Sequence, residues 1–189
     1  MQKETQSIII TAMKQYDLKL WTHCKNTATL IKMISVILGL KDPEKILLYN
    51  AALIHDVGKI FINPNILLKP QKLTPDERKI VDLHSVLGQI YVSSLGVKES
   101  IAELILLHHG YDKERYGKTY STQNCFYADI LRACDILEAV THDRPYHRKV
   151  SIEEGIKIVQ EQKDLSDSVI DALNKVFLQN ENKYLKRCP

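Results

Sequence analysis

Glycine and proline are scarce in this chain, at seven and six in 189 residues, and they fall at the breaks between apolar segments. The alternating apolar and polar runs that mark strands are absent. Apolar residues recur instead at helical spacing through most of the chain. We therefore expect an all-α protein.

Cysteines are also few, and their spacing indicates no paired motif. None of the four lies in a C-x-x-C pattern: Cys24, Cys125, Cys134 and Cys188. Reduced thiols in a cytosol are the simplest interpretation. No signal peptide is evident in residues 1–10, which carry Lys3 and Glu4 and only a short apolar stretch. We expect a cytoplasmic protein.

Long apolar runs and a strong charge bias are missing as well. The longest apolar stretch, about residues 27–40, is interrupted by Lys32 and Ser35, so we expect no membrane partner. The net charge of +3 is too small to indicate binding to a nucleic-acid polymer. A chain of 189 residues suits a single domain.

Helix start signals and breakers divide the chain into seven or so helices. Three starts are marked, by Asp42 with Pro43 and by capping boxes that open at Thr74 and Ser151. The spacing predicts helices over about 20–38, 42–55, 74–96, 101–107, 126–141, 152–161 and 165–178. The connecting loops are expected at 56–73, 110–124 and 142–150.

The histidines are the residues that indicate a function, because five of the seven lie at positions that suit a metal cluster. Imidazole and carboxylate are ligands of divalent transition metals at hydrolytic sites. The candidate ligands are His23, His55, Asp56, His84, His108, His109 and Asp135. Adjacent helical residues point about 100° apart, so His55 and Asp56 can share a cluster only at a frayed helix end, which Gly58 provides. A carboxylate there has two oxygens and can bridge two metals.

These residues resemble the signature of the HD superfamily of metal-dependent phosphohydrolases, H…HD…D, in His23, His55-Asp56 and Asp135. More narrowly, the chain resembles the HD-GYP branch, the cyclic di-GMP phosphodiesterases, from about residue 16 to about residue 175. The matching elements are HD-x-G-K at 55–59, H-P-x-x-G at 84–88 with Ser85 for the proline, HH at 108–109, and A-D-x-x-D-A-L-T-x-x-R-P-Y ending at Asp143-Arg144-Pro145-Tyr146.

The resemblance implies a single all-α domain over residues 1–189, an HD-type bundle of about seven helices with the metal site in its core. It implies two divalent metal ions, Fe or Mn first, with Ni, Mg or Zn as alternatives. Asp56 and Lys59 would be catalytic, and the phosphate contacts would be Lys59, Arg144, His147 and Arg148. The implied partner is a cyclic dinucleotide or another phosphate ester, with a second protein for regulation.

The chain departs from the branch in two places. The glutamate that follows the HH pair is missing, and Tyr116-Gly117 is a remnant of the GYP tripeptide. Lys19 stands where members with three metals carry glutamate, so two metals are expected. Two alternatives stay open: a phosphohydrolase for another nucleotide or phosphate ester, and a non-catalytic nucleotide-sensing or protein-interaction module that retains the metal site. The sequence does not indicate an oligomeric state.

Each candidate also has a structural interpretation of its own. His23 and His84 suit core histidines, and His108-His109 suits a helix C-terminus, where imidazolium meets the helix dipole. Lys59 and residues 144–149 suit a solvated loop and an exposed basic turn. Asp135 belongs to a polar stripe with i,i+3 spacing, made of Asp129, Arg132, Asp135 and Glu138.

Overall fold

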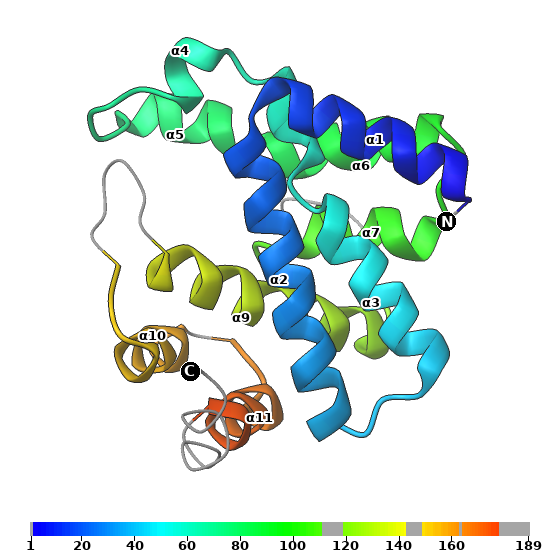
Figure 1. Ribbon diagram of the computed structural model, residues 1–189, viewed down its shortest axis with the longest axis vertical. Helices are drawn as coiled ribbons and strands as arrows, with labels where there is room; N and C mark the ends of the chain where they lie inside the picture. Colours follow the sequence, from blue (N-terminus) through cyan, green and yellow to red (C-terminus); the bar gives the residue numbers. More distant parts are fainter. Residues whose placement is uncertain (1, 111–118, 143–148, 163, 178–189) are drawn as a thin grey trace, which may run out of the picture.

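The computed structural model describes residues 2–110, 119–142, 149–162 and 164–177 (Figure 1). Within these ranges the regular structure is helical and no strand is present, which confirms the predicted all-α class. None of the helices in the described ranges combines the length and the apolar character that crossing a membrane would require.

Three long helices form the centre of the molecule. Helices α2 (Leu18–Ile37) and α3 (Asp42–Ile54) lie side by side, and α9 (Thr122–Thr141) packs across α2 (Figure 1). Their contact surfaces are apolar and fully buried, with Ile31 from α2, Leu48 from α3 and Leu131 from α9. Burial of apolar area of this kind is the main term that stabilises a helical bundle.

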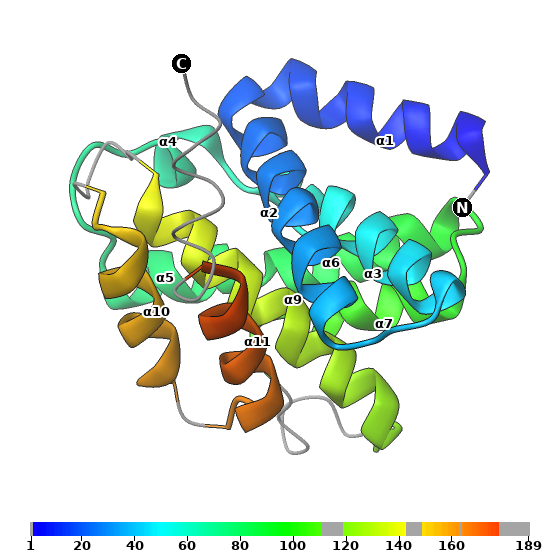
Figure 2. The same cartoon turned by 60° about the horizontal axis from the view of Figure 1, so that its bottom comes forward.

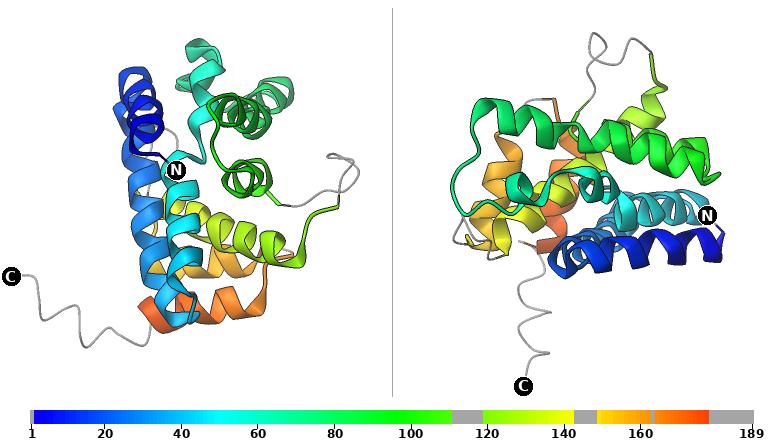
Figure 3. Two further views of the ribbon diagram at one scale, coloured as in Figure 1. Left: turned by 90° about the vertical axis from the view of Figure 1, so that its right-hand side faces the viewer. Right: turned by 90° about the horizontal axis from the view of Figure 1, so that it is seen from above.

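Shorter helices surround this centre. Helix α7 (Glu99–Leu107) runs beneath α6 (His84–Ser94) and packs against α3, while α6 packs against the 3-10 helix η1 (Val57–Phe61) (Figure 3). Helix α1 (Lys3–Tyr16) lies against α2, and the hydroxyl of Tyr16 donates to the carbonyl of Ile62, 2.9 Å away. Helices α10 (Ile152–Gln160) and α11 (Asp167–Phe177) cover α9 on another side (Figure 2).

The structure corrects three of the predicted elements. Residues 3–16 form helix α1, which buries Ile9 and Met13 one turn apart. The segment 56–73, predicted as a loop, contains η1 and the short helix α4 (Pro64–Leu67). The predicted helix 74–96 is divided at Leu83 into α5 (Pro75–Asp82) and α6.

The division at Leu83 has a local cause. The backbone carbonyl of Val81, which lies in the last turn of α5, accepts a hydrogen bond from Nδ1 of His84 at 2.6 Å. The same carbonyl and that of Ile80 also receive the N–H of Leu83, which closes the helix end tightly. The break therefore makes His84 the first residue of α6.

The predicted capping box is complete at Thr74, only its serine half forms at Ser151, and the cap before α3 lies one residue earlier than predicted. At Thr74, the hydroxyl accepts from the N–H of Glu77, and the Glu77 carboxylate accepts from the N–H of Thr74, so the capping box is complete. The Ser151 hydroxyl accepts from the N–H of Glu154 at 3.2 Å. Before α3 the cap is Lys41 rather than Asp42, because the Glu44 carboxylate binds the Lys41 N–H.

Candidate metal centre

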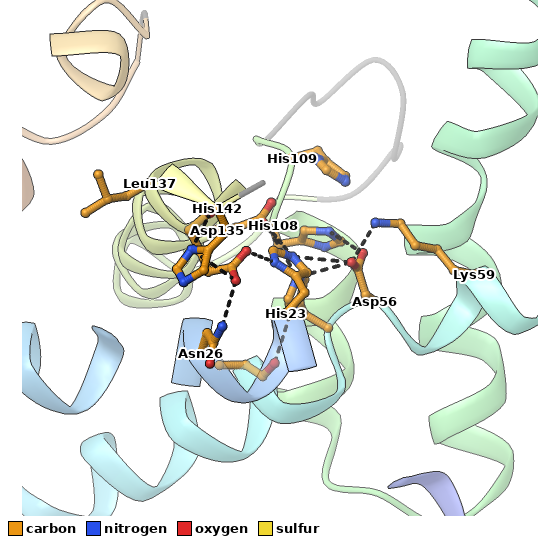
Figure 4. A network of polar contacts seen from close by, with 12 residues as sticks. His23, Asn26, Asp56, Lys59, His108, His109, Asp135, Leu137 and His142 are labelled. Carbon is orange, nitrogen blue, oxygen red and sulfur yellow. Dashed lines mark hydrogen bonds and ion pairs between the residues drawn. The ribbon is translucent and has the colours of Figure 1, made fainter. Parts of the chain in front are cut away.

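The structure brings all seven predicted metal ligands into one cluster, five of which are labelled in Figure 4; the cluster is buried except at His109, which is exposed, and Asp135, which is half-buried. They come from helix ends and helix faces that are far apart in the sequence. His55-Asp56 follows α3 directly, His84 begins α6, and His108-His109 follows α7. His23 lies within α2 and Asp135 within α9. His55, Asp56 and His108 are at most 1% exposed, so the cluster lies in the core.

Three of the imidazoles are oriented in the same way. Nδ1 of His55, His84 and His108 each lies within hydrogen-bond distance of the carbonyl three residues earlier, at 2.8, 2.6 and 2.6 Å. A carbonyl oxygen only accepts, so Nδ1 carries the proton and Nε2 presents its lone pair to the cluster. A hydrogen bond from the second ring nitrogen to a carbonyl is the usual support of a metal-bound histidine.

His55 provides a direct test of whether a metal fits. Its Nε2 atom is fully buried and has no hydrogen-bond partner among the described residues. The nearest carboxylate oxygens, Asp135 Oδ1 and Asp56 Oδ2, lie at 3.5 and 3.6 Å. A buried polar atom without a partner is costly, and a cation among these atoms would satisfy it. The residues present therefore fit a metal.

The donor atoms of the five histidines and Asp135 form two groups. The first group consists of His23, His55 and Asp135, whose donor atoms all lie within 4.8 Å of one another. Nε2 of His23 lies 2.8 Å from Oδ1 of Asp135. Nitrogen and oxygen donors at these separations suit one divalent transition metal.

The second group consists of His84, His108 and His109. Nε2 of His84 lies 3.3 Å from Nε2 of His108 and 3.0 Å from Nε2 of His109. Since Nδ1 of His84 and His108 carries the proton, the two Nε2 lone pairs face each other at short range. They repel unless a proton or a cation lies between them.

Asp56 lies between the two groups and faces each with a different oxygen. Its Oδ2 atom is 3.5 Å from Nε2 of His23 and 3.6 Å from Nε2 of His55. Its Oδ1 atom is 3.2 Å from Nε2 of His84 and 3.9 Å from Nε2 of His108. The two oxygens of Asp56 therefore face different groups of histidines.

The electrostatics of the cluster favour neutral His108 and His109 and an ionised Asp56, whereas at His55 burial is outweighed by Cys24 and Asp56, which raise the pKa of this imidazole well above its usual value. Burial, and then the neighbouring histidines, lower the pKa of His108 well below its usual value, and they lower the pKa of His109 to about 4. Burial opposes ionisation of Asp56, but the charge of Lys59 and the nearby imidazoles outweigh it and hold the pKa of Asp56 well below its usual value. For His108, His109 and Asp56 these are the protonation states that metal ligation requires.

Lys59 is held against the cluster by η1. Its Nζ atom lies 2.6 Å from Oδ2 of Asp56, and its side chain is 18% exposed (Figure 4). Gly58 permits this placement, because a Cβ added there would lie 1.9 Å from the carbonyl oxygen of His84. The close approach of η1 to α6 therefore requires glycine at this position.

Glu138 contributes a contact that the sequence analysis did not assign. Its carboxylate lies in very short contact with Nδ1 of His23 and accepts from Nδ2 of Asn26 at 3.0 Å. The contact orients His23, as the carbonyls orient the other histidines. Its position three residues after Asp135 was the available signal, since both lie on one helix face. The solvated-stripe interpretation is wrong for these two residues, whose side chains are 15% and 4% exposed.

Several predicted residues cannot be placed in this geometry. Arg144, His147 and Arg148 lie outside the described residues, as does the segment 111–118 that contains Tyr116-Gly117. Gly110 is the last described residue before this segment. It directly follows the His108-His109 pair and has a φ of +105°.

Comparison with known proteins agrees with the geometry. A model of the HD domain matches residues 5–170. The chain is 28% identical over 145 residues to the 3'3'-cGAMP-specific phosphodiesterase 3 of Vibrio cholerae serotype O1, covering 74% of this chain and 31% of that protein. It is 27% identical over 175 residues to the cyclic di-GMP phosphodiesterase of Thermotoga maritima, covering 89% of this chain and 48% of that protein. The chain thus spans less than half the length of these relatives.

Solved structures show the same fold. The HD domain of the L. monocytogenes phosphodiesterase PgpH superposes with a TM-score of 0.67 at 16% identity, over 94% of this chain and 98% of that chain. The same domain in complex with cyclic-di-AMP superposes with a TM-score of 0.66 at 15% identity, over 92% of this chain and 96% of that chain. The helical bundle, the buried His and Asp cluster and the match over most of the sequence agree, and the chain belongs to the HD-domain family.

Proposed function

We propose that this chain is a metal-dependent phosphohydrolase that hydrolyses a phosphodiester bond in a cyclic dinucleotide. The observation that carries the proposal is the placement of Asp56, whose two oxygens face two separate groups of histidines. A structural metal site needs one closed set of ligands, whereas a paired site is typical of hydrolytic phosphate chemistry.

The proposed cofactor is a pair of divalent metal ions bridged by Asp56. One would be held by His23, His55 and Asp135, and the other by His84, His108 and His109. Mixed nitrogen and oxygen donors favour Fe or Mn, with Ni, Mg or Zn as alternatives. When bound, such a pair supplies a hydroxide at neutral pH and charge stabilisation for the phosphoryl oxygens.

The protein residues have separate tasks in this proposal. Glu138 and the three backbone carbonyls hold the imidazoles in one tautomer, so that the cluster is organised before substrate binds. The Lys59 ammonium lies at the edge of the cluster and is partly exposed. It is placed to stabilise negative charge that develops on a phosphate next to Asp56.

The substrate class comes from the relatives. The matched proteins of Vibrio cholerae and Thermotoga maritima are named for 3'3'-cGAMP and cyclic di-GMP. Arg144, His147 and Arg148 are proposed to bind the phosphates of such a substrate. The departures at residues 110–117 keep another nucleotide or phosphate ester as the second candidate substrate.

A substrate panel tests the proposal. Protein purified without oxygen or chelator would be loaded with Fe²⁺ or Mn²⁺ and incubated with cyclic di-GMP, 3'3'-cGAMP, cyclic-di-AMP and mononucleotides. Cleavage of a cyclic dinucleotide that Asp56→Ala lacks supports the proposal. Cleavage of mononucleotides alone would transfer the assignment to the second candidate, and binding without turnover would favour a sensing module.

A further inference from the structure

Cys24 lies inside the metal cluster, although none of the ligand contacts described above uses it. It follows His23 on α2, and its side chain is fully buried. The Sγ atom of Cys24 and one donor atom each from His55 and Asp56 all lie within 4.8 Å of one another. Cys24 forms no disulfide, and its thiol interacts with the His55 side chain.

A second observation points to a ligand at the same place. His55 Nε2 is fully buried and has no hydrogen-bond partner among the described residues, as shown above. Two donors on one ion, each bonded at no more than about 2.3 Å, can be at most about 4.6 Å apart. The spacing of Cys24, His55 and Asp56 is close to this limit and suits a single ion.

Cys134 shows that burial alone does not produce this arrangement. It is also fully buried, and it precedes Asp135 on α9 much as Cys24 follows His23 on α2. No group of metal donors in the described part of the chain includes Cys134. Cys134 therefore behaves as a small apolar core residue, and it is a matched control for Cys24.

We propose that Cys24 supplies a sulfur ligand to the first ion, which His55 would hold and which Asp56 would face. This inference rests on the metal site of the proposed function and narrows its choice of metal. Thiolate is a soft ligand that favours Fe²⁺, Co²⁺ or Zn²⁺ over Mg²⁺ and Mn²⁺. When the Sγ–metal bond forms, the thiol proton leaves to solvent.

Cobalt spectroscopy tests the inference without reference to activity. The parent protein would carry Cys125→Ser and Cys188→Ser to remove the two thiols other than Cys24 and Cys134, and it would be loaded with Co²⁺ without oxygen. We expect a near-ultraviolet thiolate-to-cobalt band in this parent and in its Cys134→Ser variant. Cys24→Ser should lose the band, and its Co²⁺ affinity should fall by at least the ~10-fold that loss of an outer ligand partner causes.

The outcomes separate this inference from the proposed function. Co²⁺ bound by the parent without the band, or a band that persists in Cys24→Ser, would overturn the sulfur ligand and leave hydrolysis untouched. A parent that binds no Co²⁺ would overturn both. Should Cys24→Ser not fold, X-ray absorption of the Zn²⁺-loaded Cys134→Ser protein still decides, because a sulfur shell at about 2.3 Å is expected and a shell of nitrogen and oxygen alone contradicts it.

Discussion

Nζ of Lys59 lies 2.6 Å from Oδ2 of Asp56, the same oxygen that faces His23 and His55. The pair is three residues apart, at the junction of α3 and η1. A second lysine–aspartate pair with the same spacing, Lys79 and Asp76, lies exposed on α5 at 3.1 Å. Substitutions of the exposed pair, Lys79 and Asp76, are therefore controls for the same substitutions of Lys59 and Asp56.

Replacement of the bridging carboxylate should remove both metals. In Asp56→Ala we expect metal content to fall from about two ions per chain to near zero, with loss of hydrolysis, because Asp56 faces both histidine groups. Elemental mass spectrometry measures this directly. Asp135→Asn should lose only the ion of the first group, and Asp76→Ala neither. Equal losses in Asp56→Ala and Asp135→Asn would argue against a bridge.

Removal of the lysine should separate metal binding from turnover. Lys59→Ala is expected to keep its metals but to lower kcat by about 100-fold, the usual effect of removing one group that stabilises transition-state charge. Lys79→Ala should change neither quantity, because its pair is exposed on α5. A fall in the metal content of Lys59→Ala would assign the lysine to the metal site instead.

Glu138 is a positioning residue, and its effect should appear as metal affinity. Glu138→Gln weakens the contact with Nδ1 of His23 while keeping the side-chain volume. We expect metal affinity to fall by about 10–100-fold. Glu103→Gln, which alters a carboxylate that pairs with Asn124 away from the cluster, should leave the affinity unchanged. Titration of the apoprotein with Co²⁺ gives both values, and equal affinities would contradict the assigned role.

A methyl group at Gly58 should disturb both stability and the second metal group. The added Cβ would lie 1.9 Å from the His84 carbonyl, so η1 and α6 must move apart. We expect a loss of unfolding free energy of about 1–3 kcal/mol, with reduced metal content. Gly39→Ala meets open space at a φ of +65°, so it should cost stability through backbone strain but keep the metals. Denaturant unfolding and metal analysis compare the two.

The capping box of α5 should make stability depend on pH. Hydrogen bonds from Lys69 and from the Thr74 N–H lower the pKa of Glu77. A depressed pKa in the folded state means that the stabilisation is present at neutral pH and is lost as pH falls through the folded value. Glu77→Gln should therefore lower Tm at pH 7 and lose this effect as the pH falls below the usual pKa of Glu, about 4.3, and through the lower folded value. A difference in Tm that stayed constant with pH would contradict the assignment.

Much of this protein follows from local sequence. The capping box at Thr74 and the cap at Ser151 mark helix starts because a side-chain oxygen a few residues away satisfies the first free N–H groups. The order of His23, His55-Asp56, the later histidines and Asp135 was sufficient to predict a metal cluster and the HD resemblance. Side-chain type and spacing along the chain carry this information without knowledge of the fold.

Other elements were missed because local sequence does not determine them. Helix α1 is recognisable only once Ile9 and Met13 have a core to enter. The break at Leu83 depends on the His84 side chain turning back to the Val81 carbonyl, and the cap at Lys41 depends on the direction of the Glu44 side chain. Periodicity reports which face of a helix is apolar, but it does not report where a polar side chain turns.

The sequence by itself determined the helical class, most helix starts and the set of residues proposed as metal donors. Only the tertiary structure decided how these donors are shared: which histidines face each oxygen of Asp56, that Glu138 orients His23, that Gly58 must lack a side chain, and that Cys24 rather than Cys134 lies among the donors. The physical reason is that these contacts join helices far apart in the chain. Distances between such atoms are set by the packing of the core and not by any local preference of the residues.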